Sequence, residues 1–162
     1  PVDFGLARQS IPSFFVVFVV VALAGIVVDQ NGYLMLKSLP DYGPLGAMPV
    51  IDSHAWNWVD LTLGLLLVGV VEELVFRGYM CTFLSRLTRD GFKIVAISAV
   101  AFGLIHWSSG LHAVLVTSII GSIFMFAYLR TRKLPPIMLA HFAVNFLDFS
   151  GVLPKTIFRL AS

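Results

Sequence analysis

Charged residues are scarce in this sequence. Asp, Glu, Lys and Arg make up 12% of its 162 residues, whereas apolar residues make up 58%. Ordinary soluble domains carry about 25% charged residues. The mean hydropathy of +0.91 departs from the soluble range in the same direction. The shortage of charge argues against a soluble protein and predicts that residues 1–162 form a single domain embedded in a bilayer.

Cysteine is nearly absent as well, since Cys81 is the single one. One cysteine excludes an internal disulfide and any multi-cysteine metal cluster, and we expect it to serve in packing. The eleven basic residues lie mostly between apolar runs, which suits a membrane surface and gives no nucleic-acid footprint. The chain starts at Pro1 and shows no signal peptide, so we expect it to be part of a longer protein.

Five apolar segments predict an all-α fold, a polytopic transmembrane helix bundle with about five spans. The third segment is the shortest and lies near the limit for crossing a hydrocarbon core of about 30 Å. The five segments are residues 11–28, 59–84, 94–107, 111–129 and 136–153.

The connections between these segments predict an orientation. Residues 29–58 hold several Pro and Gly, which break helices, together with Trp and Tyr, which prefer the interface. We therefore expect a loop along one membrane face there. Five spans place seven basic residues on one side, one in the N-terminal stretch and six in the connections 85–93 and 130–134, against three on the other side. The positive-inside rule makes that side, and the N-terminus of this chain, cytoplasmic.

Ionisable residues inside the apolar segments carry the strongest functional signal, because a charge at bilayer depth costs about 2.5–3.5 kcal/mol or more. Glu72 and Glu73 are adjacent in the second segment, which also holds Arg77. Glu73 and Arg77 are four residues apart and share a helix face, whereas Glu72 has no obvious partner on its own helix. We therefore predict Glu72 as a catalytic base. The alternative is a structural ion pair beside a second, neutral carboxyl group.

Two further segments carry polar groups of their own. The third holds His106, one turn after Phe102, and the fifth holds His141, one turn before Asn145. At helical rise, Glu72, His106 and Asn145 each lie about 18–21 Å from a basic residue at the cytoplasmic end, so straight helices bring them to one depth. Interhelical hydrogen bonding is the alternative role for each histidine. We expect the three other ionisable residues of these regions to be interfacial, namely His54, His112 and Asp148.

Three strings in order, each within an apolar segment, resemble the motifs of the CAAX protease and bacteriocin-processing (CPBP or ABI) family of glutamic intramembrane peptidases. They are Glu-Glu-Leu-Val-Phe-Arg at 72–77, Phe-Gly-Leu-Ile-His at 102–106 and His-Phe-Ala-Val-Asn at 141–145. The resemblance covers about residues 59–153 and leaves the first helix and its loop unmatched. It implies an integral, multi-pass membrane protein that hydrolyses a peptide bond of a membrane-associated peptide or protein.

The resemblance also implies a role for each motif residue. Glu72 activates a water molecule, His106 binds and orients that water, and His141 with Asn145 stabilises the tetrahedral oxyanion. The supporting residues are Glu73, Arg77 and Phe102. The nucleophile is then water, with no cofactor and no covalent acyl-enzyme.

Other chemistries and functions stay open at this point. The sequence has no His-Glu-x-x-His motif, a single Asp in its apolar segments and no evident nucleophile elbow. A zinc mechanism is the remaining rival, because one Glu and two His form a known catalytic ligand set. The alternative functions are a non-catalytic membrane protein for peptide binding or bacteriocin immunity and, ranked last, a proton or ion carrier.

Overall fold

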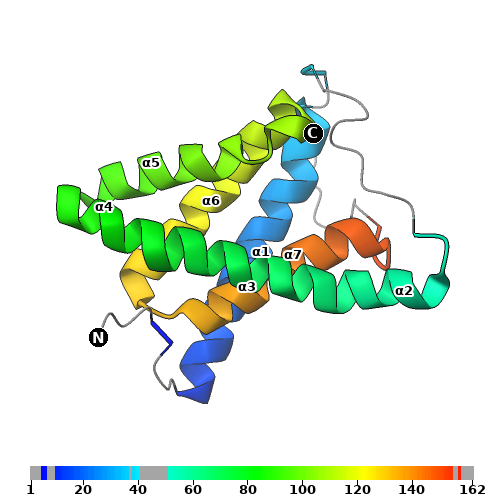
Figure 1. The fold of residues 1–162 in the computed structure, drawn as a ribbon, viewed down its shortest axis with the longest axis horizontal. Coiled ribbons are helices and arrows are strands. Elements are labelled where there is room, and N and C mark those ends of the chain that lie inside the picture. Colours follow the sequence, from blue (N-terminus) through cyan, green and yellow to red (C-terminus); the bar gives the residue numbers. More distant parts are fainter. Residues whose placement is uncertain (1–4, 7–9, 37, 41–50, 155–156, 158–162) are drawn as a thin grey trace.

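The protein is all-α over the residues that its computed structural model describes, which are 5–6, 10–36, 38–40, 51–154 and 157 (Figure 1). No strand occurs in these ranges, as the sequence predicted. The α-helices are α1 Ile11–Leu36, α2 His54–Val59, α3 Leu65–Glu73, α4 Cys81–Leu87, α5 Gly91–Leu104, α6 Leu111–Thr131 and α7 Leu134–Ser150.

The second predicted segment forms one long rod that contains α2, α3 and α4 (Figure 1). Two π-helical segments, η2 Asp60–Gly64 and η3 Leu74–Met80, join the three helices without a break, since the residues at each junction keep right-handed helical angles. The rod is therefore longer than the predicted range 59–84. π-Helical turns inside α-helices are rare and often lie at functional sites.

The predicted loop 29–58 is wrong at both ends. Helix α1 continues to Leu36 through polar residues, and Asn31 donates a side-chain hydrogen bond to the carbonyl of Val27 at 2.7 Å. A drop in hydropathy marks the end of the part of a helix that can lie in lipid, but the helix itself can continue beyond that point. At the other end α2 already begins at His54, with Ser53 as its N-cap. The intervening residues 41–50 lie outside the described ranges.

The helices that form the third and fifth predicted segments begin and end two or three residues earlier in the sequence than predicted. Helix α5 begins at Gly91 because the side chain of Asp90 accepts the N–H groups of Phe92 and Lys93, at 2.9 and 3.4 Å. It ends at Leu104, so His106 follows the helix instead of lying within it. Helix α7 begins at Leu134, just before Pro135 and Pro136. Prolines are tolerated in the first turn of a helix, because the N–H groups there have no helical partner.

The core lies where α1, α6 and α7 pack together, with α5 against α6 and α3 against α7. Phe124 and Met125 on α6 and Ile137 and Ala140 on α7 are fully buried. Cys81 of α4 is also buried in this core, in agreement with its predicted packing role.

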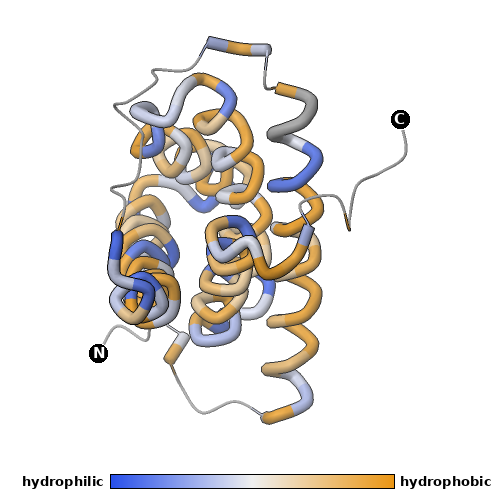
Figure 2. Tube along the Cα trace, turned by 90° about the vertical axis from the view of Figure 1, so that its right-hand side faces the viewer, coloured by the Kyte–Doolittle hydropathy of each residue, from blue (hydrophilic) through white to orange (hydrophobic). Residues whose placement is uncertain are grey.

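Most residues of the helices are apolar (Figure 2), and many large apolar side chains are exposed on the outside of the bundle. Two helical stretches are long and apolar enough to cross a membrane, residues 11–32 with mean hydropathy 2.9 and residues 111–131 with mean hydropathy 1.9. Helix α5 is a shorter apolar helix. Large exposed apolar side chains such as Phe92, 81% exposed, would be costly in water and suit contact with lipid.

Helices α5 and α6 pack closely at Gly103. A Cβ atom at this position would overlap the hydroxyl group of Ser118 and the backbone carbonyl of Val114. We expect Gly103→Ala to lower the free energy of unfolding by about 1–3 kcal/mol, because α5 must move away from α6. Thermal unfolding in detergent measures the loss of stability as a lower melting temperature. Gly91→Ala on the same helix is the control, since its Cβ would meet only Leu129 Cδ1, at 3.9 Å. Equal melting temperatures for the two variants would contradict this packing.

Candidate active site

A buried glutamate lies at the centre of the polar cluster. Glu73 is the last residue of α3, and its side chain is completely buried. Its Oε1 accepts a hydrogen bond from Arg77 Nη1 at 2.9 Å, one helical turn along the same rod, and lies 2.8 Å from Nδ1 of His141 on α7. The ion pair predicted from the four-residue spacing is present, and the same oxygen also holds an imidazole from another helix.

Arg77 is buried as completely as Glu73, and α6 supplies much of its surroundings. Its Nη2 donates to the carbonyl of Gly121 at 3.2 Å. Its guanidinium carbon lies 4.6 Å from the ring centroid of Phe102 and 5.3 Å from that of Phe124. A buried charge requires such partners, because leaving water costs several kcal/mol per ion. Aromatic faces, a carboxylate and a carbonyl together compensate this cation.

Glu72 occupies a different environment from its neighbour. Its side chain remains 23% exposed, whereas that of Glu73 is 0% exposed. Its Oε2 lies 3.7 Å from Nε2 of His141 and has no hydrogen-bond partner among the described residues. The imidazole of His141 thus lies between two carboxylates, with Nδ1 bound to Glu73 and Nε2 facing Glu72.

A close approach of two backbones makes this arrangement possible. Where α3 packs against α7 (Figure 1), a Cβ atom on Gly69 would lie 3.2 Å from the carbonyl oxygen of Met138 and 3.3 Å from the amide nitrogen of Phe142. Only glycine lets the helices come this near without a shift of either one. Gly69 precedes Glu73 by one turn, so the contact brings the two glutamates within reach of His141.

The remaining predicted site residues lie at the edge of this cluster. The ring of His106 packs on Phe102 at 5.1 Å between centroids, and Phe102 packs on His141 at 6.0 Å. His106 Nδ1 lies 2.9 Å from the carbonyl oxygen of Phe102. Asn145 is half-buried on α7, one turn after His141. Within the described ranges, no hydrogen bond or ion pair joins His106 or Asn145 to either glutamate.

Sequence reasoning missed the contribution of α6. Gly121 accepts a hydrogen bond from Arg77, and the ring of Phe124 packs on both Arg77 and His141, the latter at 5.8 Å. A glycine and a phenylalanine in an apolar segment look like ordinary core residues, so no signal in the sequence distinguishes them. Helix α6 is visible as part of the site only from the packing.

No group of three or more His, Cys, Asp or Glu side chains within the described part of the chain is arranged to hold a metal ion. Glu72 and Glu73 both lie close to His141, and Glu73 is already engaged with Arg77.

Residues 54–147 match a family model described as type II CAAX prenyl endopeptidase Rce1-like. The match begins with α2, ends in α7 and contains all three strings noted in the sequence. No curated protein and no solved structure matches the chain. The matched range is more than half of the 162 residues, and the predicted family resemblance is confirmed. The chain therefore belongs to the type II CAAX prenyl endopeptidase Rce1-like family, whose members are membrane-embedded proteases.

Proposed function

We propose that this protein is a glutamic intramembrane endopeptidase that hydrolyses a peptide bond of a membrane-associated peptide or protein with an activated water molecule. The observation that carries the proposal is the position of His141 between Glu72 and Glu73. Two carboxylates in unlike environments around one imidazole can serve as a base and as an orienting group, which are the two roles that activation of water requires.

We propose different roles for the two glutamates because their environments differ. Glu73 is sealed from solvent and its Oε1 already accepts two hydrogen bonds, so it cannot reach a substrate. The side chain of Glu72 is 23% exposed, whereas its Oε2 is itself buried and has no hydrogen-bond partner among the described residues. We therefore assign the proton of the attacking water to Glu72. Glu73 is a positioning residue that acts through His141.

The hydrogen bonds also indicate which ring nitrogen of each histidine carries a proton. A carboxylate and a carbonyl oxygen only accept, so Nδ1 donates in both His141 and His106. When neutral, His106 then carries its lone pair on Nε2 and can accept a hydrogen bond from water. His141 faces Glu72 through Nε2, and when the ring is protonated its Nε2–H can donate to an oxyanion while the carboxylate of Glu72 stays free to take the proton of the water. Asn145, one turn along α7, is the proposed second donor.

The reaction follows from these roles. The oxygen of the water attacks the carbonyl carbon while its proton moves to Glu72. His141 and Asn145 stabilise the tetrahedral oxyanion as it forms. The C–N bond then breaks, and the proton held by Glu72 passes to the leaving amine. No step forms a bond between the protein and the substrate.

The apolar surface supports a multi-pass arrangement of this site. We assign five membrane crossings to α1, the rod of α2 to α4, α5, α6 and α7, with the N-terminus of this chain on the cytoplasmic side. The basic residues at the joined ends of α4 and α5 and of α6 and α7 would then face the cytoplasm.

Reconstitution in liposomes tests the proposed activity. The substrate is a peptide ending in a CAAX sequence, supplied with and without a prenyl group on its cysteine, and mass spectrometry identifies the products. Cleavage in either arm supports the endopeptidase, and cleavage of the prenylated peptide alone assigns the substrate class. Absence of cleavage in both arms, with the protein folded, would favour the alternative role of a non-catalytic peptide-binding protein.

Chelation separates the glutamate mechanism from its zinc rival. We expect 1,10-phenanthroline to leave the rate of cleavage unchanged, because the proposed base and donors are side chains of the protein. A zinc peptidase would lose its activity and recover it on addition of Zn²⁺. The matched control is 1,7-phenanthroline, a non-chelating isomer. Loss of activity with the chelator alone would contradict the glutamate mechanism.

A further inference from the structure

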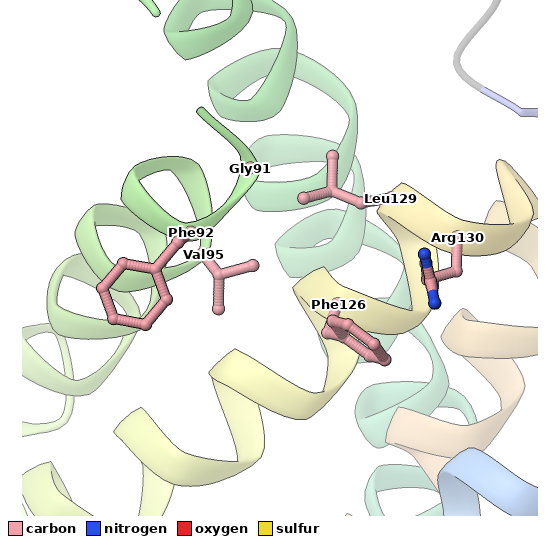
Figure 3. A pocket seen from close by; sticks show the side chains of 6 residues that line it. All are labelled: Gly91, Phe92, Val95, Phe126, Leu129 and Arg130. Atoms are coloured by element: carbon pink, nitrogen blue, oxygen red, sulfur yellow. The ribbon is translucent and has the colours of Figure 1, made fainter. Parts of the chain in front are cut away.

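An open pocket lies between the start of α5 and the end of α6, far from the candidate active site. Its volume is about 340 Å³. Figure 3 shows Phe92 and Val95 on the α5 side and Phe126, Leu129 and Arg130 on the α6 side. Gly91, which also lines the pocket, precedes Phe102 by eleven residues, or about 16 Å at helical rise. The pocket is therefore separate from the catalytic cluster.

The walls of the pocket are apolar and open toward the outside of the bundle. Phe92 is 81% exposed and Phe126 is 56% exposed. Gly91 leaves part of the wall vacant, since a Cβ there would touch only Leu129 Cδ1 at 3.9 Å. In a membrane-embedded protein such a surface faces lipid, so its natural occupant is a hydrocarbon chain.

A positive charge stands beside this apolar surface. The guanidinium carbon of Arg130 lies 5.4 Å from the ring centroid of Phe126, and the side chain is exposed. The same end of the bundle carries four further exposed basic residues, Arg86, Arg89, Lys93 and Arg132. The acidic residue of this stretch, Asp90, is engaged, because its carboxylate caps α5 by accepting two backbone N–H groups.

We infer that this pocket binds one anionic phospholipid, with an acyl chain against Phe92, Val95 and Leu129 and the phosphate near Arg130. Apolar walls beside a basic side chain match the two parts of such a lipid, its acyl chain and its phosphate. A free phosphate ion would leave the apolar walls unused, and a zwitterionic lipid would gain little from an excess of cations. Basic pockets between membrane helices recognise anionic headgroups by the same pairing of charges.

Native mass spectrometry of the detergent-purified protein tests the site. The probes are dioleoylphosphatidylglycerol and the zwitterionic dioleoylphosphatidylcholine, titrated separately. We expect one phosphatidylglycerol to bind in preference to phosphatidylcholine. Arg130→Gln should weaken its binding about fivefold, the effect of one basic residue near an anionic headgroup. Gly91→Leu should weaken it at least as much, because the new side chain occupies the pocket.

Two matched controls separate this pocket from general surface charge and bulk. Arg86→Gln removes an exposed basic residue that does not line the pocket, and Ile97→Phe adds bulk to an exposed position elsewhere on α5. Ile97→Phe should bind phosphatidylglycerol as the wild type does, and Arg86→Gln should lose clearly less binding than Arg130→Gln. Equal retention of the two lipids, or equal losses in Arg130→Gln and Arg86→Gln, would overturn the inference. Undiminished binding by a folded Gly91→Leu would overturn it too. If that variant does not fold, the comparison of the two arginine variants decides.

Discussion

Replacing Glu72 by Gln is expected to lower the rate of peptide cleavage by about 10²–10⁴-fold, the usual contribution of a general base. Glutamine keeps the size of the side chain but cannot take a proton from water. The protein should remain folded, because Glu72 makes no hydrogen bond through Oε2 within the described part of the chain. The measurement is the initial rate of cleavage in liposomes, with the melting temperature in detergent as the test of folding.

The control for this variant is Asp60→Asn, which neutralises an exposed carboxylate on the same rod. It should cleave at the wild-type rate. Full activity in a folded Glu72→Gln protein would disprove the proposed base and leave the two glutamates as a structural feature. A cellular function that survives in Glu72→Gln while cleavage is lost would favour a peptide-binding or immunity role.

Removing Arg77 is expected to destabilise the protein strongly. Arg77→Met leaves the completely buried carboxylate of Glu73 without its cation, and breaking a buried ion pair by removing one partner costs about 3–5 kcal/mol. Methionine roughly fills the space of the aliphatic stem, so loss of charge and hydrogen bonds dominates. Thermal unfolding in detergent should show a much lower melting temperature, and cleavage should be lost as well.

The double variant Glu73→Gln/Arg77→Met tests whether the uncompensated charge is the cause. A neutral Gln can still accept the hydrogen bond from His141, so the double variant should recover much of the stability lost by the single one. Arg86→Gln, which removes an exposed arginine beyond the buried part of the rod, should change the stability by less than about 0.5 kcal/mol. If Arg77→Met melts at the wild-type temperature, the ion pair does not stabilise the fold.

The sequence predicted the helices well because apolar length and helical periodicity are local properties. The four-residue spacing of Glu73 and Arg77 and of Phe102 and His106 led directly to contacts that the structure contains. The third predicted segment was wrong at its C-terminal end, since the prediction extended to Trp107 whereas the helix stops at Leu104. Capping by Asp90, at the other end, sets where α5 begins.

The sequence could predict that the polar groups lie at a similar depth, but not that Glu73 contacts His141. Equal depth in the bilayer brings polar groups to one level, but rotation of each helix decides which of them touch. The sequence predicted that Glu72, His106 and the His141–Asn145 pair meet at one depth. The structure places His141 between both glutamates, and His106 contacts Phe102, which in turn contacts His141. The catalytic assignments of Glu72, His106, His141 and Asn145 stay predictions for the experiments above.

The π-helical segment η3 is the stretch of the rod in which a change of length is best tolerated. A π-helical turn closes i→i+5 hydrogen bonds and so holds one residue more than an α-helical turn. Losing one residue within Leu74–Met80 can therefore convert that turn to an α-helical one and leave Cys81 and Leu84 pointing into the core. Losing one residue at the start of α4 would instead rotate Leu84 by about 100° toward lipid. Natural changes in the length of the rod should therefore fall within its π-helical segments.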